Sequence, residues 1–475
     1  MFNPLLYMVF FLIYTVLILW LGKYGIDRSK TLRDYYTASG SLGLFLSVST
    51  FGATWFSAAS MLGLPGLIYE YGYSAILYSV VCWFLGSLFI IMLAKRLRSY
   101  NVVTIPHFFY KRYGSAKLQM FTGLILVITY ILYIVIQIRG FGIVISFLLD
   151  IPYTVAIFLV YLFLLYTTYG GLFSVARTDA LNFCLIIAGS LLAAFFVLHE
   201  TGGWLSIHES IREKAGSGET HWFDPFYYGK YSALYFISSL FSLGIGLAAN
   251  PQYAIRLVSA KSTKTAIRMV GIATLLLGVV YMSTIVVGLG SIALIPDLKG
   301  MTPDEVYPLV IDNILTSQWK GLILVSIVAA CISTANSQLL LLASSLVYDV
   351  YGRFKPSHQS ESKRLAHNKW SITVLATVSL ILSLNAPEGL LLFSGQVWGI
   401  IAVTFFFPLF GGLFIKGATT RGAHASIVVG LSSYVLCFAI IPPGWQTYIQ
   451  PTVPALILAG ITFCMLRNRH ETNAY

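Results

Sequence analysis

Charged residues make up only 10% of this 475-residue chain, while hydrophobic residues make up 57% and the mean hydropathy is +0.79. So few charges cannot cover a globule of this size in water, which excludes a water-soluble protein and indicates one embedded in a lipid bilayer. The net charge of +12 would also fit a nucleic-acid-binding protein, but its basic residues are spread along the chain in the way that sets membrane topology, so we expect no nucleic acid partner.

The apolar segments predict an all-α polytopic membrane protein with about 13 transmembrane helices. Each segment is close to the ~20 residues that a helix needs to cross the hydrocarbon. No long polar segment separates them, so we expect a single membrane transport domain over residues 1–475. The predicted spans are 4–22, 41–66, 72–94, 118–148, 153–169, 179–199, 231–250, 268–295, 319–350, 369–385, 392–415, 422–442 and 450–466.

The basic residues predict an N-terminus outside the cell and a C-terminus inside it. In that orientation, 24 of the 30 Lys and Arg residues lie in or beside cytoplasmic segments, and 12 of the 18 acidic residues lie outside. A cytoplasmic excess of Lys and Arg is the pattern that orients membrane proteins. No basic residue precedes the first apolar segment, which favours a retained helix over a cleaved signal peptide. We therefore expect a multi-pass protein of the inner (plasma) membrane.

The second span, 41–66, carries small and hydroxyl residues through its middle, interrupted by Trp55 and Phe56. Two interpretations fit this composition. Small residues allow two membrane helices to cross closely. They also occur where a membrane helix is broken, and the carbonyls freed at such a break can bind ions or polar solutes.

The ninth span has one face of small and hydroxyl side chains at helical spacing, which are Ser326, Ala330, Ser333, Thr334 and Ser337. Hydroxyl and carbonyl oxygens are hard ligands without a net charge, and they suit a weakly held monovalent cation. The same hydroxyls could instead form hydrogen bonds between helices, at about 1 kcal/mol each. The pattern alone leaves both interpretations open.

Polar residues interrupt the fourth, sixth and seventh spans. Asn250 and Gln252 flank Pro251 at the inner end of the seventh span, where a helix end at the interface is the simpler interpretation. Arg139, deep in the fourth span, could pair with a solute carboxylate or serve a structural role. Asp179 opens the sixth span, where a carboxylate near a helix N-terminus is expected.

Several motifs, taken together and in order, resemble those of the sodium/solute symporter family, in its pantothenate/proline-type branch. The resemblance runs from about residue 30 to residue 465, and its most specific part is the segment 329–340. The motifs are Phe51-Gly-Ala with Gly63-Leu-Pro-Gly66, Tyr169-Gly-Gly-Leu-Phe-Ser-Val-Ala-Arg-Thr-Asp179, Asn250-Pro-Gln-Tyr-Ala-Ile-Arg256 with Ser259-Ala-Lys-Ser262, Ala329-Ala-Cys-Ile-Ser-Thr-Ala-Asn-Ser-Gln-Leu-Leu340 and Tyr348-Asp-Val-Tyr351.

This resemblance implies a leucine-transporter-type core of two inverted five-helix repeats, at 41–199 and 231–415. One extra helix (4–22) would precede the core and two (422–466) would follow it. The resemblance also implies a sodium site between the broken second span and the ninth span, and a coupling or gating role for Asp179. The implied sodium ligands are the carbonyls of Ala53, Phe56 and Ala330 and the hydroxyls of Ser333 and Thr334.

The resemblance implies a sodium-coupled symporter that imports a small organic solute, and the solute is harder to predict. Proline members carry an aspartate where this chain has Trp55, and aromatic residues where it has Leu243 and Leu247. The segments 293–298 and 333–340 look closest to the pantothenate-type branch. We therefore expect an organic acid such as pantothenate or a monocarboxylate. The candidate solute-binding residues are Trp55, Ser57, Gln137, Arg139, Asn250, Gln252 and Gln396.

Other functions on the same scaffold remain alternatives at this point. They are a proton-coupled or uncoupled carrier, and a symporter for proline, another amino acid or a sugar. An enzyme is not expected, because the sequence has no paired carboxylates or nucleophile–base pair. No cofactor is expected beyond the co-transported sodium, because the five cysteines show no metal-ligand spacing.

Overall fold

The computed structural model describes residues 4–26, 28–215, 221–226, 232–298, 300–314, 319–354, 361–446 and 448–468. Over these residues the fold is all-helical, as predicted, and its one extended pairing is an isolated bridge between Leu42 and Ala260. The helices are α1 (Pro4–Ile26), α2 (Leu32–Thr37), η1 (Ala38–Gly40), α3 (Leu44–Trp55), η2 (Ala59–Gly63), α4 (Leu64–Tyr71), α5 (Tyr73–Ile76), η3 (Leu77–Val81), α6 (Cys82–Ser99), α7 (Ile105–Tyr113), α8 (Ala116–Leu149), α9 (Tyr153–Thr168), α10 (Gly171–Thr201), α11 (Trp204–Ala215), η4 (His221–Phe223), α12 (Ala233–Ser239), η5 (Leu240–Ile245), α13 (Gly246–Ala249), α14 (Pro251–Ser259), α15 (Thr263–Leu294), η6 (Pro303–Glu305), α16 (Val306–Ile314), α17 (Lys320–Ser344), η7 (Ser345–Tyr351), α18 (Gly352–Phe354), α19 (Glu361–Ser383), α20 (Leu390–Phe406), η8 (Phe407–Gly411), α21 (Gly412–Phe414), α22 (Thr420–Ile440), α23 (Pro443–Gln446) and α24 (Thr452–Met465).

Nine helical segments of the described chain are long and apolar enough to cross a bilayer. One further segment is a bent pair, in which α3 meets the helix over Ala59–Tyr71 at 57°. Three more apolar helices, Tyr7–Lys23, Tyr153–Thr168 and Thr452–Met465, are shorter. These segments coincide in position with the predicted spans, while the count of 13 and the N-out orientation stay predictions.

Several predicted boundaries differ from the structure by more than a helical turn. The largest differences are at the sixth, seventh and tenth spans, and the tenth begins at Ser362 rather than at residue 369. The sixth span begins at Gly171 rather than at residue 179, and the seventh continues to Ser259 rather than ending at residue 250. The first correction moves Asp179 from the start of the span to its interior, and the second brings Arg256 into the span; both residues are buried. A hydropathy boundary drawn at a charge therefore fell inside the helix.

Hydroxyl side chains fix where many of the helices begin. Thr104, Ser115, Ser262 and Thr419 each precede a helix and accept a hydrogen bond from a backbone N–H of its first turn. This contact satisfies one of the donors that a helix start leaves free. These four capping residues lie in the basic segments that are predicted to be cytoplasmic. The same short connections therefore carry both the topology signal and the start of the next helix.

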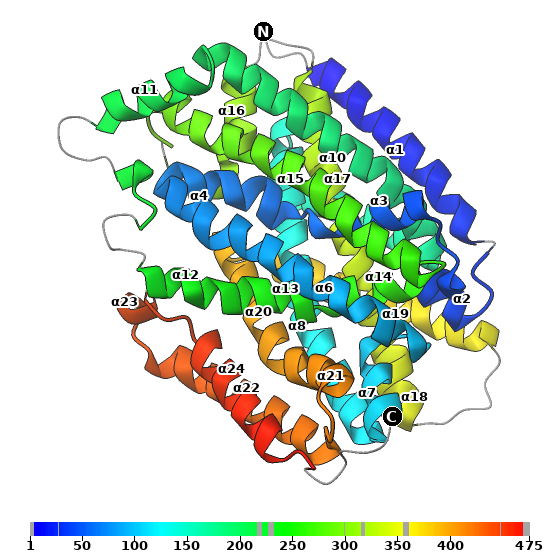
Figure 1. Cartoon of the computed structure of the whole chain (residues 1–475). Coiled ribbons are helices and arrows are strands. Elements are labelled where there is room, and N and C mark those ends of the chain that lie inside the picture. The colour runs from blue at the N-terminus through cyan, green and yellow to red at the C-terminus, as the bar shows by residue number, and fades with distance from the viewer. Residues whose placement is uncertain are drawn as a thin grey trace.

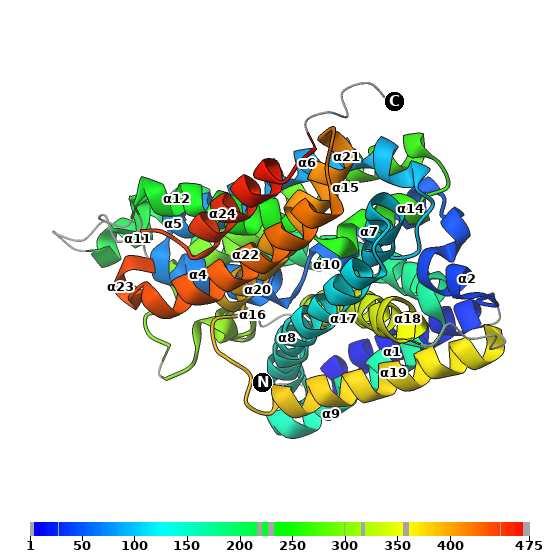
Figure 2. The ribbon, with the colours of Figure 1, turned by 90° about the horizontal axis from the view of Figure 1, so that it is seen from below.

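Helix α17 lies at the centre of the molecule, and its residues from 320 to 344 are nearly all buried. It packs against α1, α3, α8, α9, α10 and α19. Helices α22 and α24 lie side by side at the edge of the molecule in both ribbon views (Figures 1 and 2). The small and hydroxyl residues of α17 are therefore packed inside the protein and do not face lipid.

Candidate functional site

The second span is broken at mid-helix, as one of the two interpretations of its sequence required. Helix α3 ends at Trp55, and Phe56 takes an extended backbone conformation with φ −79° and ψ 114°. The chain resumes helical geometry at Ala58. A helix end leaves its last carbonyls without intrahelical partners, so the break exposes backbone oxygens in the interior of the protein.

Two hydroxyl groups of α17 point at these oxygens. Ser333 Oγ donates to the carbonyl of Ala53 at 2.8 Å and to that of Ala330 at 3.1 Å. Thr334 Oγ1 lies 3.1 Å from the Phe56 carbonyl oxygen. All five residues are completely buried. The structure thus brings together the five oxygen donors that the family resemblance implies as sodium ligands.

The seventh span is also broken, inside the protein rather than at its surface. Asn250 is extended between α13 and α14, with φ −68° and ψ 122°, and its side chain caps the N–H of Gln252 at 3.1 Å. Both residues are about 1% exposed. The simpler sequence interpretation, a helix end at the interface, is therefore wrong. Pro251 supports the break because it occupies the first turn of α14, where no backbone donor is needed.

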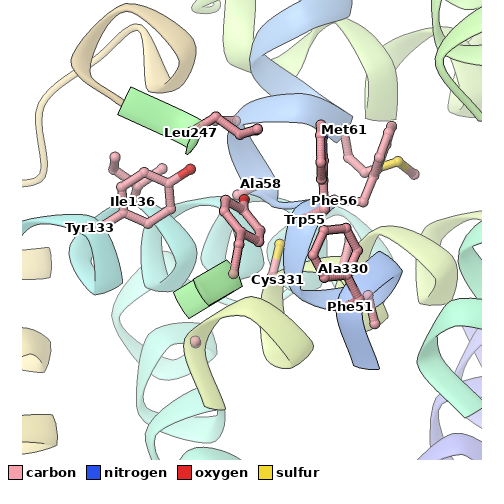
Figure 3. Close-up of a cluster of buried hydrophobic side chains, with 14 of the residues drawn as sticks. Phe51, Trp55, Phe56, Ala58, Met61, Tyr133, Ile136, Leu247, Ala330 and Cys331 are labelled. Carbon is pink, nitrogen blue, oxygen red and sulfur yellow. The ribbon is translucent and has the colours of Figure 1, made fainter. Parts of the chain in front are cut away.

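Aromatic side chains from six spans surround the two breaks. Trp55 lies with its ring centroid 5.4 Å from that of Tyr253, and its indole N–H donates to the Tyr281 hydroxyl at 3.0 Å. Trp398 lies 6.1 Å from Tyr133 between ring centroids. We call Trp55, Trp83, Tyr133, Tyr253, Tyr281 and Trp398 the aromatic cage. In Figure 3, Trp55 and Phe56 of the first break lie to the right of Tyr133, with Cys331 and Ala330 below them in this view.

Several polar groups in and beside the cage have no hydrogen-bond partner among the described residues. They are the indole nitrogens of Trp83 and Trp398, the amide nitrogens of Gln137 and Gln252, and the hydroxyl of Tyr253. Leaving a buried polar group unpaired costs about 1–3 kcal/mol. Four of the five groups can only donate a hydrogen bond. A ligand rich in acceptor oxygens would satisfy them.

Arg139 does not join this cluster. Its Nη1 donates to the Ala386 carbonyl at 2.7 Å, and its Nη2 lies 3.7 Å from the Asp304 carboxylate. Asp304 also accepts the N–H groups of Gly389 and Leu390 at 3.0 Å each, at the start of α20. Burial raises the pKa of Asp304, and Leu390 and Arg139 oppose that shift. The prediction that Arg139 binds solute is therefore not supported, because its guanidinium is engaged by a connection outside the spans.

Gln396 also lies apart from the other candidates. Its side chain is exposed and lines a cavity of about 230 Å³ between α20, α22, α24 and η5. Tyr434, whose hydroxyl donates to the Gln396 carbonyl at 2.9 Å, lines the same cavity. Trp398 faces the cage from the same helix, because two residues along a helix separate side chains by about 200°. Trp398, and not the predicted Gln396, is therefore the residue of this segment of α20 that lies in the aromatic cage.

Asp179 lies two turns inside α10 and is completely buried, not at a helix N-terminus as expected. Thr50 donates to its Oδ2 at 2.5 Å, and Arg256 Nη2 lies 3.9 Å from the same oxygen. Arg256 also contacts Thr54 and Ser337, and Thr54 is adjacent to the carbonyl set of the first break. The acid is therefore linked to the first break through a buried ion pair with Arg256 and the hydrogen bonds that Arg256 makes.

Sequence reasoning missed most of the aromatic cage. Trp83 and Tyr281 lie in apolar stretches, where an aromatic residue is usually core packing, and Tyr253 follows the polar residues Asn250 and Gln252. The available signal was the number of aromatics with a polar edge, because a buried Trp or Tyr usually finds a hydrogen-bond partner. That signal cannot tell which of them will stay unpaired.

Comparisons with known proteins identify the family and the fold of this chain. The model of the sodium:solute symporter family matches residues 35–430. A sodium/proline symporter of Staphylococcus aureus is 26% identical over 451 residues, covering 91% of this chain and 85% of its own. Among solved structures, a sodium-coupled sialic acid symporter in a substrate-bound outward-open state is 19% identical, with a TM-score of 0.80 over 97% of this chain and 98% of its own. Mhp1, a nucleobase-cation-symport-1 family transporter, is 15% identical, with a TM-score of 0.57 over 91% and 94%. The chain is a multi-pass membrane transporter, not an enzyme, and it belongs to the sodium:solute symporter family.

Proposed function

We propose that this protein is a sodium-coupled symporter that imports a small organic solute across the inner (plasma) membrane. The observation that carries the proposal is the convergence of Ser333 and Thr334 on the carbonyls freed at the first helix break. Hydroxyl and carbonyl oxygens without a carboxylate give a site of modest affinity, which suits an ion that must be released on the other side. Sodium and solute are the only ligands in the proposal, and no cofactor is included.

The solute in this proposal is an organic acid of the size of a monocarboxylate or pantothenate. The unpaired groups of Trp83, Trp398, Gln137 and Gln252 are hydrogen-bond donors. An ionised carboxylate accepts hydrogen bonds and donates none, so it complements these groups. Both buried arginines near the breaks, Arg139 and Arg256, already face acidic partners. The positive charge that balances the solute would therefore come from the sodium ion.

Proline is the second candidate. The Staphylococcus aureus relatives are named sodium/proline symporters, and they match most of this chain. The rings of the aromatic cage would attract the ammonium of an amino acid by cation–π interaction, which contributes about 0.5–2 kcal/mol. Against proline stand Leu243 and Leu247, at positions where the family's proline members carry aromatic residues.

Coupling in this mechanism is thermodynamic. Sodium bridges α3 and α17, and solute binds between the same break and the cage, so each ligand stabilises the arrangement that the other needs and raises its affinity. The membrane potential adds about 2.3 kcal/mol per charge at 100 mV to sodium entry. Asp179 and Arg256 lie inward of the site, joined by their buried ion pair, and we assign Asp179 a gating role in sodium release.

Uptake into proteoliposomes tests the proposal and identifies the solute. Purified protein is supplied with labelled pantothenate, proline, short monocarboxylates or sugars, under an inward sodium gradient or with equimolar potassium. The proposal predicts accumulation of one carboxylate-bearing solute in sodium alone. Equal uptake in both salts would contradict sodium coupling and favour a proton-coupled or uncoupled carrier, and accumulation of a neutral sugar would contradict the solute class.

A further inference from the structure

Helix α8 contacts the first break through the side chain of Gln137. The side-chain oxygen of Gln137 accepts the backbone N–H of Ala58 at 2.9 Å, where the outer half of the broken helix begins. Gly140, one turn further along α8, allows this approach, because a Cβ added there would lie 2.5 Å from the Ala58 Cβ. The contact is completely buried. Gln137 therefore serves as the N-terminal cap of a helix half from a different span.

The same helix touches the second break two turns away. The Tyr130 hydroxyl donates to the Asn250 side-chain oxygen at 2.6 Å and accepts the N–H of Gln252 at 3.0 Å. Both breaks are thus held by polar side chains from one face of α8, since residues seven apart share a face. A change in the position of α8 must therefore alter the backbone geometry at both breaks.

Of Tyr130 and Gln137, Gln137 is the residue with one group at each of the two proposed binding sites. Its oxygen fixes Ala58, two residues after Phe56, whose carbonyl belongs to the proposed sodium set. Its amide nitrogen is buried and has no partner among the described residues. An amide is planar, so the direction of its oxygen sets the direction of its nitrogen. A solute oxygen that binds the nitrogen would therefore hold the oxygen on Ala58 and keep the sodium-binding shape of the break.

We propose that Gln137 is a positioning residue that links solute binding to sodium binding, with its oxygen holding the first break and its nitrogen donating to the solute. The inference rests on the proposed function and adds to it a physical route for the coupling. It differs from a role as a solute contact alone, since it requires sodium affinity to depend on Gln137 even when no solute is present.

Sodium binding to purified protein without solute separates these two roles. We expect Gln137→Leu, which removes the acceptor for the Ala58 N–H, to raise the sodium Kd at least tenfold. Gln446→Leu is the matched control, because Gln446 bonds only the nearby Ile441 carbonyl, and its Kd should equal that of the wild type. An unchanged sodium Kd in Gln137→Leu, with solute uptake lost, would overturn the inference and leave a plain solute contact.

A second variant keeps the test decisive if Gln137→Leu does not fold. Gln137→Glu retains an acceptor for Ala58 but replaces the amide nitrogen, so we expect its sodium Kd to stay within threefold of the wild type. The tightening of sodium binding by the transported solute should be lost in this variant. Retention of that tightening would overturn the inference. No sodium binding by the wild-type protein would overturn the proposed function as well, which distinguishes the two failures.

Discussion

At the scale of single residues, the sodium proposal depends on two hydroxyl groups and can be tested one atom at a time. Thr334→Ala removes an oxygen that lies 3.1 Å from the Phe56 carbonyl, whereas Thr334→Ser keeps that oxygen. A hydrogen bond or ligand to a charged group contributes about 1.5–3 kcal/mol, and each 1.4 kcal/mol is about tenfold in affinity. The sodium concentration for half-maximal uptake should rise at least tenfold in Thr334→Ala and little in Thr334→Ser. Equal values in both variants would contradict the assignment of the hydroxyl as a ligand.

The aromatic cage makes a separate prediction, for solute rather than for sodium. Trp398→Phe keeps a ring but removes an indole N–H that has no protein partner. Loss of one hydrogen bond to an ionised solute should raise the solute KM by about tenfold, while sodium binding without solute stays at the wild-type value. The matched control is Trp370→Phe, because Trp370 is 68% exposed on α19. A solute KM unchanged in Trp398→Phe would remove Trp398 from the site.

Sequence reasoning reached part of this site and not the rest, for reasons that differ between residues. Helical spacing put Ser333 and Thr334 on one face of a span, and the family resemblance added the carbonyls they meet. The partner of Arg139 was harder to predict, because its long side chain carries the guanidinium away from its own Cα and toward Asp304. No pattern of spacing reports that reach. The place of Trp398 in the site was harder to predict, because whether its indole N–H finds a partner depends on how the folded protein packs.

At the scale of helical elements, the connection from η6 to α16 packs over the outer half of the broken second span. Gly66 of α4 lies so close to this connection that an added Cβ would be 2.1 Å from the Pro303 carbonyl oxygen. Asp304 fastens the connection to α20 through two backbone N–H groups and faces Arg139. The connection is therefore fastened over the half of the span that the topology prediction places outside, where it would act as a lid.

Removing this fastening should open the lid more often. In a cysteine-free background, Asp304→Ala should increase the rate at which an impermeant thiol reagent labels Ser60→Cys from outside, severalfold over the parent. Ser60 is buried in η2, beside the cage residue Tyr281. Glu209→Ala, an exposed acid of α11, is the control and should not change the rate. An unchanged rate in Asp304→Ala would show that Asp304 does not hold the lid.

At the scale of the whole molecule, hydropathy and charge predicted the positions of the apolar segments well. Two of the largest boundary errors, in the sixth and seventh spans, concern one pair of buried charges. Asp179 and Arg256 belong to different spans, but their charged atoms lie 3.9 Å apart and are nearly inaccessible to solvent. Each charge makes the burial of the other acceptable. A hydropathy scale scores each span alone, so it started one span at Asp179 and ended the other six residues before Arg256.

The predicted orientation can be checked directly in cells. With the N-terminus outside, α11 lies outside and the start of α19 lies inside. In intact cells, an impermeant thiol reagent should label Glu209→Cys on α11 and should leave Lys363→Cys on α19 unlabelled until the membrane is permeabilised. Both positions are exposed, so access decides the result. The reverse labelling pattern would overturn the N-out, C-in topology.

The central claim is that sodium and solute cross together by way of the first helix break. The most direct measurement is solute-driven sodium movement, in proteoliposomes held at zero membrane potential and loaded with equal sodium on both sides. An inward gradient of the transported solute should drive uptake of radioactive sodium by the wild-type protein, and the Ser333→Ala/Thr334→Ala variant should show none. Sodium that does not move with the solute, or that moves equally well in the double variant, would contradict the account.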